Sequence, residues 1–105
     1  MIDAFVPLAV SRLVVGLKPI NMRWREDRIR SYCRDELGIE PDTATAFLFT
    51  NSKRDGPLLY CVDADGDRLI QKKLDKGAFL LPAPESEGAA YVSMKRTMLS
   101  RLFRS

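Results

Sequence analysis

The chain has 105 residues, of which 46% are hydrophobic and 30% are charged. This length predicts a single domain, residues 1–105, with one core, and the composition excludes a disordered tail. No apolar run reaches the ~20 residues that a membrane-spanning helix needs. The start of the chain, acidic and interrupted by Pro7, does not resemble a signal peptide. We therefore expect a cytoplasmic protein.

The sequence contains no histidine. Histidine is the usual general base at neutral pH and the commonest ligand of transition metals, so its absence excludes catalysis by a Ser–His or Cys–His pair. The two cysteines, Cys33 and Cys61, form no Cys-x-x-Cys motif, and we expect two buried, reduced thiols. Catalysis by carboxylates with a metal ion, or by lysine, stays open after this exclusion. We nevertheless expect a protein that is not an enzyme and that holds no metal or cofactor.

The first half of the chain predicts a strand followed by a helix. Residues 10–17 are rich in β-branched side chains and end before Pro19, which is typical of a strand. Asn21 is a candidate N-cap and Gly38 a candidate stop for a helix over residues 22–37. The expected core face of this helix consists of Met22, Ile29, Cys33 and Leu37.

Three short strands are predicted next, at residues 46–50, 58–62 and 68–74. Each segment is largely apolar or alternates between apolar and polar residues, and each is bounded by a cluster of turn residues. The tight turns between them predict antiparallel pairing.

The last part of the chain predicts an exposed connection over residues 82–89, because proline, serine and glycine are frequent there. A short extended piece at 89–92 and a helix over 94–104, capped by Ser93, follow. We therefore expect an α+β fold with its core in residues 10–82: a small, antiparallel, meander-like sheet, covered on one face by the helix of the N-terminal half and the short C-terminal helix.

Basic side chains gather on the predicted first helix, at the tip of the first hairpin and around the strand at 68–74. The net charge of +3 favours a polyanionic partner only mildly, so the positions of the basic residues matter more than the net charge. The alternative is a solvated helix face with i,i+4 ion pairs and an edge strand protected by charge. Trp24 beside the arginines either stacks on a base or packs against a loop. The candidate phosphate-binding residues are Arg23, Arg30, Arg34, Lys53, Arg54, Lys72, Lys73 and Lys76.

The acidic run at residues 63–67 invites comparison with a calcium-binding loop. An EF-hand loop requires Gly at its sixth position and Glu at its twelfth, and this chain has Arg68 and Leu74 there. We therefore expect an acidic turn. The carboxylate pattern of a metal nuclease and a glycine-rich phosphate loop are also missing from the sequence.

An ordered series of segments resembles a known family. The series consists of Asn21-Met22-Arg23, Glu40-Pro41, Ala46-Phe47-Leu48-Phe49-Thr50-Asn51, Lys53-Arg54-Asp55, Leu59-Tyr60, Asp65-Gly66, Lys72-Lys73-Leu74-Asp75-Lys76-Gly77-Ala78-Phe79 and Leu81-Pro82. Over about residues 15–82 it is similar to the TnpB-type small accessory protein encoded by bacterial insertion sequences of family 66. Two positions depart from the family pattern: Asn21, where Asp is usual, and Cys61, where Trp is usual.

The resemblance implies a role in transposition beside a separate, larger transposase that carries the catalytic carboxylates. DNA binding and docking onto the transposase are both compatible with it. We expect a DNA-binding accessory factor. The alternative is an interaction module that docks onto the transposase or forms a homodimer through Met94, Met98 and Leu102 of the predicted C-terminal helix.

Overall fold

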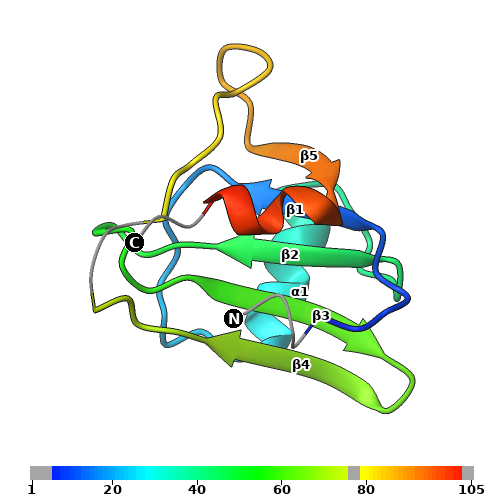
Figure 1. Ribbon diagram of the computed structural model, residues 1–105. Helices are drawn as coiled ribbons and strands as arrows, with labels where there is room; N and C mark the ends of the chain where they lie inside the picture. Colours follow the sequence, from blue (N-terminus) through cyan, green and yellow to red (C-terminus); the bar gives the residue numbers. More distant parts are fainter. Residues whose placement is uncertain (1–5, 76–78, 103–105) are drawn as a thin grey trace.

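A computed structural model describes residues 6–75 and 79–102. In this part of the chain, a five-stranded sheet of order β4-β3-β2-β1-β5 lies between a helix and a 3-10 helix (Figure 1). The strands are β1 (Arg12–Gly16), β2 (Thr45–Phe49), β3 (Leu58–Asp63), β4 (Gly66–Gln71) and β5 (Tyr91–Lys95). The helices are α1 (Glu26–Asp35) and η2 (Arg96–Leu102). The predicted α+β class is confirmed.

The sheet separates two apolar cores, because successive side chains of a strand point to opposite faces. The first core packs under η2 and includes Leu13, Leu48 and Leu59 from the sheet. The second core packs under α1 and includes Phe47 and Tyr60. β2 is buried along its whole length, which explains why its sequence is continuously apolar rather than alternating.

Two features of the predicted sheet are wrong. The sheet is mixed, because β1 and β2 are parallel while the other neighbours are antiparallel. A parallel pair needs a crossover connection, and α1 supplies it. The helices also lie on opposite faces of the sheet instead of one, because the central strands have apolar side chains on both faces to bury (Figure 1).

The helix begins four residues later than predicted, at Glu26. Asn21 caps a turn instead: its Oδ1 accepts the backbone N–H of Arg23 at 2.9 Å, and its carbonyl accepts that of Trp24 at 3.1 Å. The predicted stop is confirmed, since Gly38 follows the helix with a φ of +69°. Of the predicted core face, Ile29, Cys33 and Leu37 are buried and Met22 is half-buried.

The strand predicted at 68–74 lies at Gly66–Gln71, because Asp63 pairs with Gly66 across a shorter turn than expected. Near the C-terminus, residues 91–95 continue as β5, so the predicted cap at Ser93 is wrong. The Ser93 hydroxyl accepts a hydrogen bond from Arg12 Nε at 2.7 Å. The predicted helix at 94–104 is a 3-10 helix from Arg96, and its last two residues lie outside the described part of the chain.

Cys33 and Cys61 are buried and unpaired, as predicted. They lie on opposite faces of the sheet, in the second and the first core respectively. Burial raises the pKa of the Cys33 thiol to about 12 and that of the Cys61 thiol to about 11. Within the described residues, no helix is both long and apolar enough to cross a membrane.

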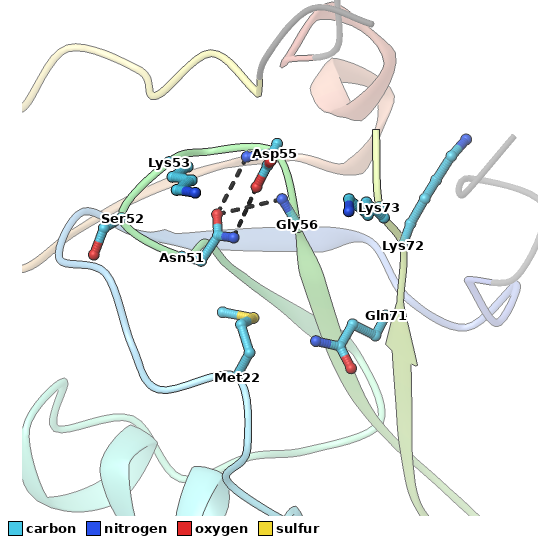
Figure 2. A pocket seen from close by; sticks show the side chains of 9 residues that line it. All are labelled: Met22, Asn51, Ser52, Lys53, Asp55, Gly56, Gln71, Lys72 and Lys73. Atoms are coloured by element: carbon cyan, nitrogen blue, oxygen red, sulfur yellow. Dashed lines mark hydrogen bonds between the residues drawn. The ribbon is translucent and has the colours of Figure 1, made fainter. Parts of the chain in front are cut away.

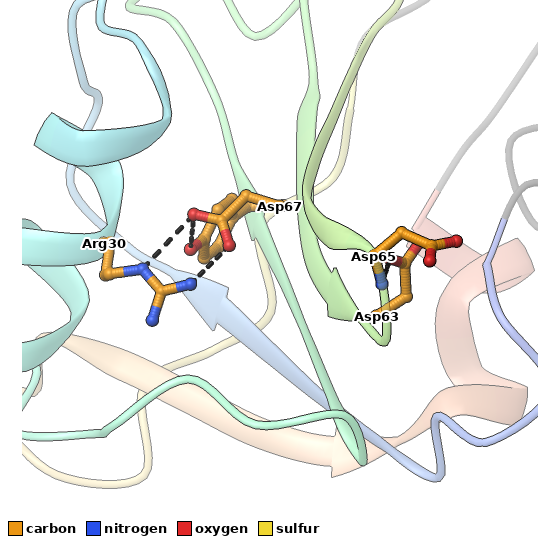
Figure 3. A network of polar contacts seen from close by, with 5 residues as sticks. Arg30, Asp63, Asp65 and Asp67 are labelled. Atoms are coloured by element: carbon orange, nitrogen blue, oxygen red, sulfur yellow. Dashed lines mark hydrogen bonds and ion pairs between the residues drawn. The ribbon is translucent and has the colours of Figure 1, made fainter.

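One polar network joins α1 to the edge strand β4 (Figure 3). Asp67 Oδ2 accepts hydrogen bonds from Arg30 Nε at 3.2 Å and from the Tyr60 hydroxyl at 2.8 Å, and its Oδ1 accepts one from Arg30 Nη2. The side chains of Arg30 and Asp67 are 32% and 16% exposed, so solvent only partly screens the pair. The alternative of i,i+4 ion pairs on the helix face would pair Arg30 with Glu26, but the acidic partner of Arg30 comes from β4.

The network generates a stability prediction. We expect Asp67→Asn to lower the free energy of unfolding by about 1–3 kcal/mol, because the Arg30 guanidinium loses its charged acceptor in a partly buried site. Urea denaturation measures the change. Asp65→Asn is the matched control, since the Asp65 side chain is exposed, and we expect it to change stability by less than about 0.5 kcal/mol. Equal effects of the two substitutions would contradict this role of Asp67.

The same pair predicts a pH dependence. The hydrogen bond from Arg30 holds the pKa of Asp67 below its ordinary value, and that from Tyr60 acts in the same direction. The stabilisation is therefore complete above about pH 5 and is lost as the pH falls below about 4 through the lowered pKa. We expect the stability difference between the wild type and Asp67→Asn to shrink between about pH 6 and about pH 3. A difference that stays constant over this range would refute the assignment.

Candidate nucleic-acid interface

Two lysine-bearing segments meet beside the first hairpin. The loop after β2 supplies Lys53, and the extended segment after β4 supplies Lys72 and Lys73. With Met22 and Gln71 they line an open hollow of about 670 Å³ (Figure 2). Residues far apart in the sequence thus form one cationic site.

Asn51 fixes the loop that carries Lys53. Its Oδ1 accepts the backbone N–H groups of Asp55 and Gly56 at 3.2 and 3.3 Å, and its Nδ2 donates to Asp55 Oδ1 at 2.8 Å (Figure 2). A Cβ on Gly56 would lie only 3.1 Å from that Nδ2, so glycine allows the close approach. The sequence analysis missed this role, although Asn at the start of a turn cluster is its usual signal.

Backbone hydrogen bonds hold the other lysines beside this loop. The N–H of Lys72 donates to the Pro57 carbonyl at 3.1 Å, and the N–H of Leu74 donates to the Asp55 carbonyl at 2.7 Å. These bonds extend the pairing of β3 and β4 past the end of β4. Lys72 and Lys73 are therefore placed by the backbone of the hairpin, and their side chains remain exposed.

A second hollow, of about 470 Å³, adjoins the first. Met22 and Gln71 line both hollows, so the two are neighbours. The second is bounded by the loop that precedes α1 and by side chains of β3 and β4. We call the two hollows together the basic groove; its main residues are Lys53, Lys72, Lys73, Met22, Gln71, Arg23, Trp24, Arg25, Leu58 and Leu69.

The groove carries more positive than negative charge. Lys53, Lys72, Lys73 and Arg23 are exposed and form no ion pair with another described residue. Arg25 pairs with Glu26 at 3.4 Å. Asp55 is the acidic residue lining the first hollow and Glu26 the one lining the second. Cations without a protein partner are available to neutralise an anion from solution.

The structure thus brings four of the eight predicted phosphate-binding residues together: Arg23, Lys53, Lys72 and Lys73. Arg30 is engaged by Asp67. Arg34 is exposed in the last turn of α1, away from the residues of the groove. Arg54 is exposed at the hairpin tip with a φ of +60°. Lys76 lies outside the described residues.

Of the two roles proposed for Trp24 from the sequence, packing within the protein is observed, although against the second core rather than a loop, and stacking on a base stays a prediction. Trp24 packs against the second core, where its ring centroid lies 5.5 Å from that of Tyr32. The guanidinium of Arg28 lies 4.7 Å from the centroid of its indole. Trp24 also lines the groove, so it is accessible to a ligand there.

The predicted interaction surface is largely used by the fold. Leu102 is buried and Met94 packs against the first core from β5, while Met98 is half-buried in η2. The three side chains therefore do not form an exposed stripe on one helix.

The acidic run at 63–67 is a turn, as predicted. Asp63 Oδ1 accepts the N–H of Asp65 at 2.9 Å, and its Oδ2 pairs with Arg68 at 3.3 Å. Asp67 instead lies against α1, away from the other two carboxylates (Figure 3). In the part of the chain that the structure describes, no three potential metal ligands gather at one point.

The basic groove and most of the fold lie inside a region that matches a known family. The family described as IS66 Orf2 like protein matches residues 11–105. Neither a curated protein nor a solved structure matches the chain. The match extends over nearly the whole chain and agrees with the ordered segments found in the sequence. The chain belongs to the IS66 Orf2-like family.

Proposed function

We propose that this protein acts in transposition by binding DNA along the basic groove. Family membership indicates an accessory protein of IS66 transposition, and DNA binding is the step added by the proposal. The observation that carries it is the meeting of Lys53 with Lys72 and Lys73 in one hollow, continued toward Arg23 by the second.

The chemistry of the groove suits phosphate contacts. Lysine is a compact cation on a flexible stem, which follows a phosphate backbone without demanding one geometry. Three lysines face one carboxylate in the first hollow, so a polyanion gains more attraction than repulsion there. Each neutralised phosphate releases counterions, which makes such binding strongly dependent on salt.

The groove offers little for reading a base sequence. The amide of Asn51 already bonds to Asp55 and Gly56, so it is not available to a base edge. Gln71 is the remaining uncharged amide of the groove. We therefore expect affinity that depends on phosphates much more than on sequence.

Docking onto the transposase, or self-association, is the alternative function. The surface expected to mediate it gives it little support, because Leu102 and Met94 pack in the first core. It becomes the leading hypothesis if the protein fails to bind nucleic acid.

The first test is a fluorescence-anisotropy titration of the protein against a duplex from the end of its element and against a scrambled duplex, at ~50 and ~200 mM salt. We expect micromolar binding to both duplexes. If all four exposed groove cations contact phosphates, the slope of log K against log salt is roughly −3 to −4. Lys72→Ala/Lys73→Ala should flatten this slope by about 2 and weaken binding at least tenfold at the lower salt.

Lys95→Ala/Arg101→Ala is the matched control for that titration. It removes the same charge from exposed positions in β5 and η2, outside the groove. We expect it to keep the wild-type slope. An equal loss in both double variants would show attraction by net charge alone, and no binding of the wild type at the lower salt would refute DNA binding.

A second prediction concerns the loop conformation. Asn51→Ala leaves every charge in place but removes three hydrogen bonds that shape the Lys53 loop. We expect duplex affinity to fall about three- to tenfold, because Lys53 is no longer held beside Lys72 and Lys73. Ser52→Ala, in the same loop and exposed, serves as the control and should bind as the wild type does. An unchanged affinity of Asn51→Ala would exclude preorganisation of the loop as a source of affinity.

A further inference from the structure

The two ends of the basic groove differ in chemistry. The first hollow is lined mainly by lysines and loop polar groups, whereas the second contains Trp24, Leu58 and Leu69 beside its arginines. Met22 lines both hollows. The groove therefore passes from a hollow lined by lysines to one where an aromatic side chain lies among arginines.

A DNA duplex accounts for the cations of the groove but not for Trp24. A duplex keeps its bases stacked inside and presents phosphates to a protein surface, so it offers no base face to the indole. An unpaired base, by contrast, presents an apolar π-face beside its own phosphate. Proteins that bind single strands combine a cationic track with an aromatic platform for this reason.

Trp24 is held in place to act as such a platform. Its ring contacts Tyr32, and Tyr32 in turn meets Phe49 edge-on at a centroid distance of 5.7 Å, which ties the indole to the second core. Trp24 also lines a further hollow of about 370 Å³ along α1, so it stands between two depressions. Arg28 lines this further hollow, and its guanidinium lies over the indole, which helps to fix the ring in place.

We infer that the basic groove takes single-stranded DNA, with the backbone along Lys53, Lys72 and Lys73 and an unpaired base against Trp24. The inference rests on the proposed function and narrows it, since it names the form of DNA that the groove prefers. Exposed lysines alone would bind the phosphates of single-stranded and of duplex DNA alike. Lysines combined with a fixed aromatic side chain favour the single strand, because only its bases are free to stack.

The chain offers a built-in reporter, because Trp24 is its single tryptophan. Oligothymidylate of about 16 nucleotides, titrated at ~50 mM salt, should quench the Trp24 fluorescence to saturation. A duplex of the same length should quench little. Labelled strands followed by anisotropy should show the single strand binding at least about fivefold more tightly than the duplex.

Substitution of Trp24 distinguishes the contribution of base stacking to affinity from that of charge. We expect Trp24→Leu to weaken binding of the labelled single strand by between about 5- and 150-fold, and to leave duplex binding within about twofold. Trp24→Phe keeps an aromatic ring and should retain most of the single-strand affinity. Circular-dichroism melts check the fold of both variants. If Trp24→Leu fails to fold, the quenching of the wild type and the affinity of Trp24→Phe decide the question.

Each outcome separates this inference from the proposed function. Duplex binding that depends on Lys72 and Lys73, without quenching or preference for oligothymidylate, would overturn the inference and leave the proposed function standing. Tighter binding of oligouridylate than of oligothymidylate would overturn the assignment to DNA. No binding to any of these strands would overturn both.

Discussion

The structure depends on the burial of β1 and β2 on both of their faces. A strand that is apolar on both sides needs a cover on each, and α1 and η2 supply the two covers. Because β1 and β2 are also parallel, the chain must cross over one face between them, and α1 with its flanking loops is that crossover. The crossover brings the loop before α1 to the ends of β3 and β4. The basic groove lies at this junction, so its position follows from the way in which the central strands are buried.

The hydrogen bonds of Asp67 fix the position of α1 relative to the strands beside the groove. Arg30 belongs to the crossover helix and Asp67 to the edge strand, so their pair connects the helix that follows the groove-lining loop to the strand that carries Leu69 and Gln71. The Tyr60 hydroxyl adds a bond from β3, and burial, followed by the hydrogen bond to Asp67, raises the pKa of Tyr60 above its ordinary value. Asn51 likewise fixes a groove-lining segment, because its hydrogen bonds hold the loop that carries Lys53. Neither residue needs to touch a ligand to determine what the groove can bind.

Local patterns in the sequence predicted the elements, but not the contacts between distant ones. Residues 46–50 and 58–62 were identifiable as strands because apolar runs and a turn cluster suffice for a hairpin. Asn21 was ambiguous, because an Asn side chain caps a turn and a helix with the same short-range hydrogen bond. Met94 fits either a helical stripe or an alternating strand, and pairing with β1 decides for the strand. The partner of Arg30 lies 37 residues away, beyond the reach of any i,i+4 pattern. Likewise, the lysines were identified one by one, and only the fold places them together.

The fold uses its two kinds of cation differently. Several arginines have partners within the described structure: Arg30 binds Asp67, Arg28 covers Trp24, and Arg96 donates to the carbonyls of Val6 and Val10. A planar guanidinium suits such fixed, directional contacts. The described lysines form no ion pair with another described residue, and three of them line one hollow. A net charge of +3 therefore understates the local attraction for a polyanion. Several arginines contact other groups of the protein, whereas three exposed lysines lie together in the first hollow. We therefore base the proposed binding surface on the place where positive charge lacks partners among the described residues, and not on the net charge.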